Sequence, residues 1–393
     1  MRRGEQARHW QTITIMIVLT LFCDATAMAQ DGRDSGFRPL LNGRDLTGWV
    51  LVNTPAETWT VKDDLLICSG NPIGEIRTER MYQNFILEVE WRHLVPGGNA
   101  GIFVWADDIT ARGVPFHRSV EVQVLENAYG QSQGHTTHGD IFPIHGAKLT
   151  PLNGRGGNRA FPVEERSLPS PQWNHYRIEC RDGEIALAVN GKVVTRGREA
   201  SPRKGYLCLE SEGGVVHYRN LKIQELPETP IDAEHIAVAN RGFVSLYSGL
   251  DLRGWTIAPA SGSHWISEDW VLRFDGGTPE GLSEVVHEAA FDHPGFLMDI
   301  QPEADFRELV LNTGDPENLI RLSMDDPELK GLLQSGQWTR LEWEQRDGHW
   351  VITVDGKALQ KRVPVSVGKL AMSFIIRGPA RFANLYGRSA NGK

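Results

Sequence analysis

Short runs in which hydrophobic and polar side chains alternate recur along the first half of the chain. Alternation at every second residue is typical of a strand with one buried face, and these runs are rich in β-branched and aromatic residues. Asp-Gly and Asn-Gly pairs in 181–184 and 189–192 predict tight hairpin turns. No helical periodicity intervenes, so the pattern predicts an all-β fold of antiparallel sandwich type. The expected strands cover 85–91, 101–105, 120–126, 175–180 and 185–191.

The chain repeats itself. The ten residues from Leu40, LLNGRDLTGW, return from Leu246 as LYSGLDLRGW, with six of the ten positions identical. A second block that begins at Trp173 returns at Trp338, and both tryptophans are expected to anchor a core. A repeat of this length indicates two copies of one domain rather than a solenoid. The predicted units are a sandwich at 37–226, a linker at 227–240 and a second, degenerate sandwich at 241–388.

Residues 1–29 have the pattern of a secretory signal peptide. Three arginines precede an apolar run at 13–22, and a small-residue cleavage motif follows at 27–29. A membrane anchor is the alternative, but a run of about ten residues is too short to cross a bilayer. We therefore expect an exported protein, periplasmic or secreted, with no membrane span.

Composition and charge narrow the function classes. Of 393 residues, 40% are hydrophobic and 23% are charged, which is typical of folded domains. A formal net charge of −9 argues against a nucleic-acid partner. Four cysteines are too few for a disulfide scaffold, and Cys23 lies in the predicted signal peptide. We expect Cys68, Cys180 and Cys208 as buried free thiols, although export leaves a disulfide between Cys180 and Cys208 open.

Candidate chemistry gathers in the middle of the first copy. In PGGNAGIFVW, strand geometry places Asn99 and Trp105 on one face, either as a sugar-binding platform or as a turn and a core strand. In SVEVQVLE, the valines point to the core, and Glu121 and Gln123 point to the opposite face, which either lines a groove or is solvated. A bulge would bring Glu126 to the same face. The resulting Glu-x-Gln-x-x-Glu spacing resembles the Glu-x-Asp-x-x-Glu of laminarinase-like glycosidases.

Histidines and a second pair of acids add further candidates. GHTTHGDIFPIHGAK is predicted to be a loop, in which His135, His138 and Asp140 either bind a divalent metal or lie at the surface. Glu210 and Glu212 share one strand face in CLESEGG beside Gly213-Gly214, either as site residues or as exposed acids near a hairpin. The second copy has no counterparts of these groups, so any active site is expected in the first copy.

The segments FILEVEWRHLVPGGNAGIFVW, VEVQVLEN and WNHYRIECRDGEIALAVNGKVV, with the repeated blocks around them, resemble the 3-keto-disaccharide hydrolase family in the same order. The resemblance covers 37–226, and 241–388 only in its first and last blocks. It implies a concanavalin A-like jelly-roll fold in each copy and a glycan-processing protein. Asn99, Glu121 and Gln123 match motif positions of the family, whereas a valine and a glutamate replace its Tyr and closing Asp.

The resemblance implies a hydrolase, or a lyase followed by hydration, that acts on 3-keto-glycosides. On this hypothesis Glu121 is the base or the acid, Gln123 and Asn99 orient hydroxyl groups or an enolate, and His138 or His135 is the partner acid or a metal ligand. The other expected substrate contacts are Trp105, Glu126, Glu210 and Glu212. A divalent metal is the one cofactor expected, and a carbohydrate is the partner. Two alternatives are a non-catalytic, lectin-like protein and a direct glycosidase that uses Glu121 and Glu126.

Overall fold

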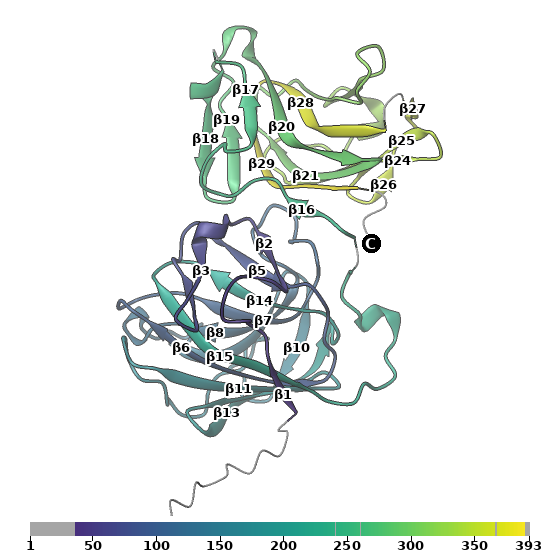
Figure 1. Cartoon of the computed structure of the whole chain (residues 1–393). Coiled ribbons are helices and arrows are strands. Elements are labelled where there is room, and N and C mark those ends of the chain that lie inside the picture. Colours follow the sequence, from purple (N-terminus) through teal and green to yellow (C-terminus); the bar gives the residue numbers. More distant parts are fainter. Residues whose placement is uncertain (1–35, 240, 260, 366–367, 390–393) are drawn as a thin grey trace, which may run out of the picture. The chain divides into compact units, whose positions relative to one another are not determined.

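The computed structural model describes residues 36–239, 241–259, 261–365 and 368–389. They belong to one compact unit, Gly36–Lys393, and their strands form four sheets, two in each half of the unit (Figure 1). Every ladder between named strands is antiparallel, so the predicted all-β sandwich fold is confirmed. The predicted signal peptide lies outside the described residues.

The first sandwich consists of a large and a small sheet. The large sheet has the order β10 (Lys148–Pro151), β13 (Lys192–Ser201), β12 (Glu184–Val189), β11 (Asn174–Arg181), β6 (Phe85–His93), β15 (Val216–Glu225), β4 (Leu65–Cys68) and β3 (Trp59–Lys62), and β1 (Phe37–Pro39) also pairs with β15. The small sheet has the order β2 (Trp49–Val52), β5 (Gly74–Thr78), β14 (Tyr206–Ser211), β7 (Gly101–Ala106), β8 (Ser119–Val124) and β9 (His138–Ile144). Val120, Val122 and Val124 of β8 lie in the core between these sheets, as predicted.

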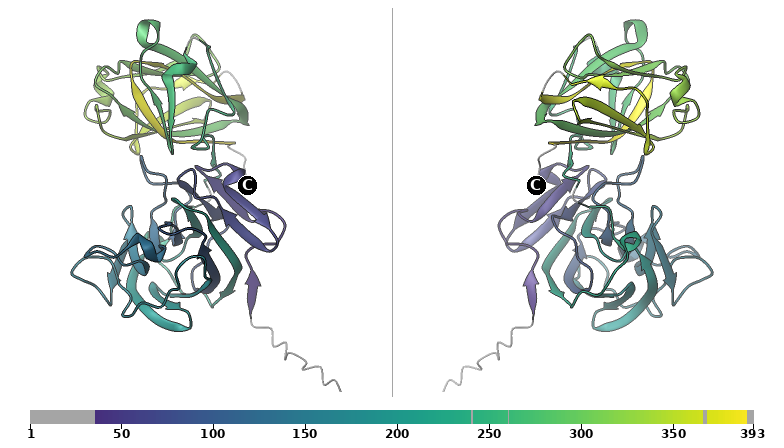
Figure 2. Two further views of the ribbon diagram at one scale, coloured as in Figure 1. Left: turned by 90° about the vertical axis from the view of Figure 1, so that its left-hand side faces the viewer. Right: turned by 90° about the vertical axis from the view of Figure 1, so that its right-hand side faces the viewer.

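The second sandwich has its own core and two further sheets. Its large sheet has the order β18 (Trp265–Glu268), β19 (Val271–Phe274), β29 (Ala380–Ser389), β21 (Pro294–Pro302), β24 (Thr339–Arg346), β25 (His349–Val354) and β26 (Lys357–Ala358); β16 (Val244–Ser245) pairs with β29, and β27 (Val363–Pro364) with β25. Its small sheet has the order β17 (Trp255–Ile257), β20 (Leu282–Asp292), β28 (Lys369–Arg377), β22 (Glu308–Leu311) and β23 (Ile320–Ser323). The strands of each sandwich lie in two layers (Figure 2).

The helices in the described part of the chain are single 3₁₀ turns. They are η1 (Ala56–Thr58), η2 (Asn127–Tyr129), η3 (Ala233–His235), η4 (Gly262–His264), η5 (Pro279–Gly281) and η6 (Pro327–Leu329). Among the residues that the structure describes, no helix has the length and apolar character that crossing a membrane requires.

The two sandwiches share one strand order. In the large sheets, the order β3-β4-β15-β6-β11-β12-β13 of the first sandwich corresponds to β18-β19-β29-β21-β24-β25-β26 of the second. In the small sheets, the order β2-β5-β14-β7-β8 corresponds in the same way to β17-β20-β28-β22-β23. In the described residues, β9 and β10 are the strands of the first sandwich that lack such a counterpart. A common order of this length is what two copies of one domain would produce.

Trp105 departs from the predicted alternation. Its φ is 57°, and the ladder between β7 and β14 shifts register between Tyr206 and Cys208. This irregularity turns the indole into the core, where it is 0% exposed and its Nε1 donates to the carbonyl of Gln83 at 2.8 Å. Trp105 therefore stabilises the core and is not part of an exposed sugar-binding platform.

The histidine-rich segment is a loop up to Thr137 and again at 145–147, contrary to the prediction of a loop throughout. From His138 the chain forms β9, because Ile141 pairs with Val122 and is fully buried. The expectation for the cysteines is confirmed, since Cys68, Cys180 and Cys208 are buried and free.

We predict that Trp105→Ala lowers the free energy of unfolding by about 3–5 kcal/mol, because it empties a large core position. Val193→Ala is the matched control, since Val193 is 40% exposed. Urea unfolding of both variants measures the effect. A Trp105→Ala protein as stable as the control would contradict this placement of the indole.

Candidate active site

The polar face of the first small sheet gathers carboxyl groups from β5, β14 and β8, with β7 between the last two. Since the valines of β8 point to the core, Glu121 and Gln123 point to the opposite face. Glu75 of β5 and Glu210 of β14 lie directly opposite each other in the ladder between those strands. On the other side, Gln123 pairs with Gly101 of β7. The middle of this face is therefore acidic.

Gly101 makes room for two of these carboxyl groups. A Cβ atom at this position would lie 2.8 Å from Glu210 Oε2 and 3.0 Å from Glu121 Oε1. Contacts below about 3 Å are closer than carbon normally approaches, so a larger residue would push the carboxyl groups apart. The absence of a side chain at Gly101 thus lets Glu121 and Glu210 converge on one point.

Two amide side chains in series join one of the acids, Glu212, to β8. Gln123 Nε2 donates to Asn99 Oδ1 at 3.1 Å, and Asn99 Nδ2 donates to Glu212 Oε2. Glu212 in turn shares a hydrogen bond with Glu210. The structure therefore brings together five residues that the sequence singled out, which we call the carboxyl cluster: Asn99, Glu121, Gln123, Glu210 and Glu212.

The carboxyl cluster holds protons strongly. Burial, together with the charge of Glu212, raises the pKa of Glu121 to about 8. Burial and the neighbouring charge of Glu121 raise the pKa of Glu210 well above its ordinary value, and burial also raises the pKa of Glu212. Like charges in so small a space cannot all ionise, so part of the cluster is protonated at neutral pH. It can then present a proton donor and a proton acceptor side by side.

Sequence reasoning missed two groups around the cluster, Glu75 and Arg159, and considered a third, Asp140, in another role. Glu75 pairs with the buried His117, whose Nδ1 lies 2.5 Å from Glu75 Oε1. Arg159 pairs with the buried Asp140 at 2.9 Å, and its charge opposes the rise in the pKa of Glu121. Glu75 and Arg159 lie outside the quoted motifs. Glu75 reaches the site through the pairing of β5 with β14, and Arg159 lies next to Ala160, which forms an isolated bridge with Ile141. Asp140 lies in the histidine-rich segment but had been considered only as a metal ligand.

Glu75 and His117, together with Cys208, could hold a metal ion. The ligand atoms of Glu75, His117 and Cys208 all lie within 4.8 Å of one another, and all three residues are buried. Within the described part of the chain, Glu75 Oε2 and His117 Nε2 have no hydrogen-bond partner. Nitrogen, oxygen and sulfur ligands together suit a borderline-soft ion such as Zn²⁺. Because burial and the charge of Glu75 raise the pKa of the Cys208 thiol, metal binding there would release a proton.

The histidines expected at the site lie elsewhere. Both ring nitrogens of His138 lie 2.5 Å from Ser167 Oγ, and burial lowers the pKa of His138 to about 4, so it is neutral at neutral pH. His135 Nδ1 lies 2.8 Å from Ser132 Oγ, beside the ring of Tyr129. Neither contact leads to the carboxyl cluster, so the structure does not bring these two histidines to it.

Glu126 is bound to the backbone rather than to Glu121. Its Oε2 accepts from the amides of Gly97 at 2.7 Å and Ala128 at 2.8 Å, and its Oε1 accepts from the amide of Ser170 at 2.9 Å. Burial alone would raise the pKa of Glu126, but these amides lower it. The carboxylate caps η2 and joins three chain segments.

The raised pKa of Glu121 predicts a pH-dependent stability. A carboxyl whose pKa is higher in the folded state stabilises the fold fully below its unfolded value, and this contribution is lost as the pH rises through about 8. We expect wild-type unfolding free energy to fall between about pH 6 and pH 8.5 more steeply than that of Glu121→Gln, by up to about 1.4 kcal/mol per pH unit. Urea unfolding at several pH values measures both slopes. Glu179→Gln, at an exposed position, should keep the wild-type slope, and equal slopes for all three proteins would contradict the prediction.

Comparison with known proteins agrees with the predicted resemblance for the first sandwich. Residues 36–224 match the sequence model of a family described as a 3-keto-alpha-glucoside-1,2-lyase-like domain. No curated protein matches the chain. Two similar crystal structures are of candidate glycosyl hydrolases from Parabacteroides distasonis: one is 22% identical with a TM-score of 0.39, over 51% of this chain and 98% of that one. The other is 23% identical with a TM-score of 0.37, over 48% of this chain and 99% of that one. The family match spans β1 to β15, the strands that build the carboxyl cluster.

Proposed function

We propose that the first sandwich is a glycan-processing enzyme that cleaves 3-keto-glycosides by elimination, with or without hydration of the product. The observation that carries this proposal is the convergence of Glu121 and Glu210 on Gly101, with pKa values raised by burial and mutual charge. The family match over the same residues supports the substrate class. A sugar ketone needs a base and an acid close together, and this pair provides them.

The reaction follows from the acidity that a ketone gives its neighbour. A base removes the proton from C2, and the electron pair of that C–H bond forms an enolate with the C3 oxygen. The enolate then collapses: C3 regains its carbonyl, C1 and C2 become doubly bonded, and the C1–O bond breaks as the leaving oxygen takes a proton. Water can add afterwards, its oxygen to C1 and its proton to C2, which completes a net hydrolysis without an oxidant.

The side chains divide these tasks. Ionised Glu121, with a pKa of about 8, is a stronger base than an ordinary carboxylate and removes the C2 proton. Protonated Glu210 donates to the leaving oxygen, in place of the histidine expected from sequence. Asn99 and Gln123 hold Glu212 and orient the sugar hydroxyl groups. Because Glu121 is only 6% exposed, the groups over the cluster must move when a sugar binds.

A divalent ion fits the proposal but is not a step in it. Glu75, His117 and Cys208 would hold the ion, and its positive charge would stabilise a nearby enolate oxygen. The residues that perform proton transfer are the same with or without it.

The proposal also covers the rest of the chain: the protein is exported, and one of its two sandwiches is active. The arginine-rich N-terminus supports export to the periplasm or beyond. The shared strand order supports the interpretation of 241–388 as a degenerate second copy. In that copy Ile375 pairs with Glu284 as Glu210 pairs with Glu75, so an aliphatic side chain stands where the proposed acid would be. Catalysis is therefore assigned to the first copy alone.

The test is turnover of a 3-keto-glycoside and of its unoxidised parent by wild type, Glu121→Gln and Glu210→Gln. We expect turnover of the keto substrate only, and a loss of about 100-fold or more in kcat for each variant, since each removes a proton-transfer group. Deuterium incorporation at C2 from heavy water, followed by NMR, reports the proton step directly. Glu179→Gln, on an exposed position of β11, is the control and should match wild type.

Three outcomes would contradict the proposal. Undiminished turnover by Glu121→Gln would remove its role. Binding of the sugar without turnover by wild type would favour the lectin-like alternative. Turnover of the unoxidised glycoside would favour a direct glycosidase.

A further inference from the structure

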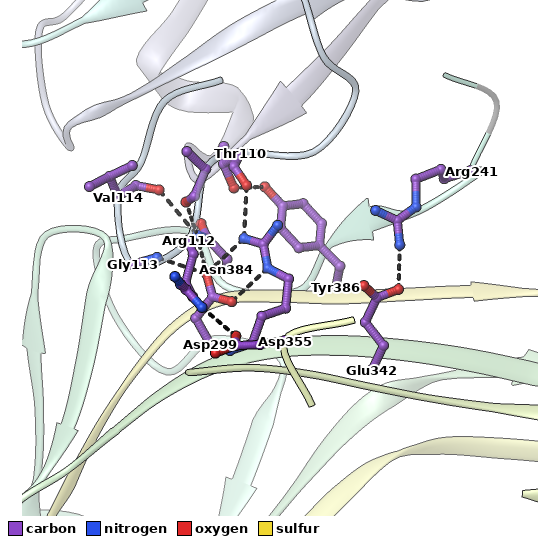
Figure 3. Close-up of polar contacts among 12 residues, drawn as sticks. Thr110, Arg112, Gly113, Val114, Arg241, Asp299, Glu342, Asp355, Asn384 and Tyr386 are labelled. Carbon is purple, nitrogen blue, oxygen red and sulfur yellow. Dashed lines mark hydrogen bonds and ion pairs between the residues drawn. The ribbon is translucent and has the colours of Figure 1, made fainter. Parts of the chain in front are cut away.

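The connection between β7 and β8, residues 107–118, is a short two-stranded extension that we call the β7–β8 loop. Thr110 and His117 form an antiparallel bridge across it, and the amide of Ala111 donates to the carbonyl of Phe116 at 2.8 Å. Its tip contacts the second sandwich through Gly113, whose amide donates to Asp299 (Figure 3). Its base carries His117, the partner of Glu75. One rigid element thus connects the second sandwich to the candidate site.

Asp299 of β21 is the centre of the contact. It is 0% exposed and accepts from both Nε and Nη2 of Arg340, at 2.7 and 2.8 Å. Its Oδ2 also accepts from Asn384 Nδ2 at 2.7 Å and from the amide of Gly113 at 2.8 Å. Figure 3 shows Asp299 beside Asn384 and Gly113. A buried carboxylate needs this many donors to offset the loss of water. One of the four comes from the β7–β8 loop.

The side chains around Asp299 bind the loop through its backbone. Arg340 Nη2 donates to the carbonyl of Thr110 at 2.8 Å. Asn384 Nδ2 donates to the carbonyls of Ala111 at 2.9 Å and Val114 at 3.1 Å. Backbone groups do not depend on rotamers, so these bonds fix the path of the loop rather than the position of one side chain.

Packing reinforces the polar contacts. A Cβ atom on Gly113, whose φ is +72°, would lie 2.4 Å from the indole of Trp338, so only glycine allows this approach. Trp338 is thus a partly exposed base for the loop rather than the expected core anchor. Ile109 forms a small apolar cluster with Phe243, Leu297 and Tyr386 of the second half of the chain. The Tyr386 hydroxyl lies 2.9 Å from Thr110 Oγ1.

We propose that the second sandwich serves as a clamp for the β7–β8 loop, and that Asp299 is a positioning residue which keeps His117 against Glu75 beside the carboxyl cluster. Besides its ring contact, the backbone amide of His117 donates to Glu75 Oε1 at 3.1 Å, so a displaced loop would withdraw two contacts from one carboxylate. The effect of Asp299 on catalysis rests on the proposed function. Its effect on the position of the β7–β8 loop does not.

Hydrogen exchange of the full-length protein tests the clamp without any substrate. We expect Asp299→Asn and the milder Tyr386→Phe to raise the exchange rate of peptides covering 107–118 by about fivefold or more, with little change in the other strands of the first sandwich. Glu303→Gln is the matched control, because it breaks an ion pair with Arg273 on the same large sheet without touching the loop. Unchanged protection of the loop in Tyr386→Phe, or equal loosening in the control, would overturn the proposal.

Kinetics then separate positioning from mere stability. In Tyr386→Phe we expect kcat on the 3-keto-glycoside to fall about tenfold with KM within about twofold of wild type and an unchanged melting temperature, because only the alignment of His117 and Glu75 is disturbed. If the loop exchanges faster but kcat stays at the wild-type value, the positioning role is overturned. The proposed role of Glu121 would not be affected by that result. Absence of turnover in wild type would instead count against the proposed function, while the exchange result would still decide the clamp.

Discussion

The burial of like-charged carboxyl groups in one small space is the constraint on which the site depends. Glu121, Glu210 and Glu212 cannot all ionise where their neighbours are acids and water is largely excluded. Such a cluster persists only if its surroundings prevent it from relaxing. The small sheet does so: the valines of β8 are fixed in the core, Gly101 admits two carboxyl groups, and Asn99, which is held by Gln123, donates to Glu212.

We relate the presence of the second sandwich to the same constraint. It has the strand order of the first but aliphatic side chains at the corresponding position of β28, so it would contribute structure rather than acid groups. Its large sheet binds the backbone of the β7–β8 loop through Arg340 and Asn384. On the proposal made above, the second sandwich, in which Ile375 stands where the proposed acid would be, supports the first sandwich.

Much of the fold and half of the site follow from local sequence. Alternation in β8 was enough to place Glu121 and Gln123 on the polar face, because a strand with three core valines leaves no other choice. Trp105 was misplaced because a bulge, which alternation cannot reveal, reverses the face of one residue. Glu75 was missed since its approach to Glu210 depends on the pairing of strands far apart in the chain. His138 is a similar case, as burial against Ser167 is set by tertiary packing.

Direct titration of the glutamate side chains tests the central claim that the carboxyl cluster shares protons. The measurement is ¹³C NMR of the side-chain carboxyl signals in protein labelled at glutamate, assigned by single Gln substitutions. The account predicts that the signals of Glu121 and Glu210 titrate above about pH 6, well away from the ordinary value near 4.3, and that Glu121→Gln shifts the titration of Glu210 downward. If both carboxyl groups titrate near pH 4, independently of each other, the cluster is not a proton-sharing site and the account is contradicted.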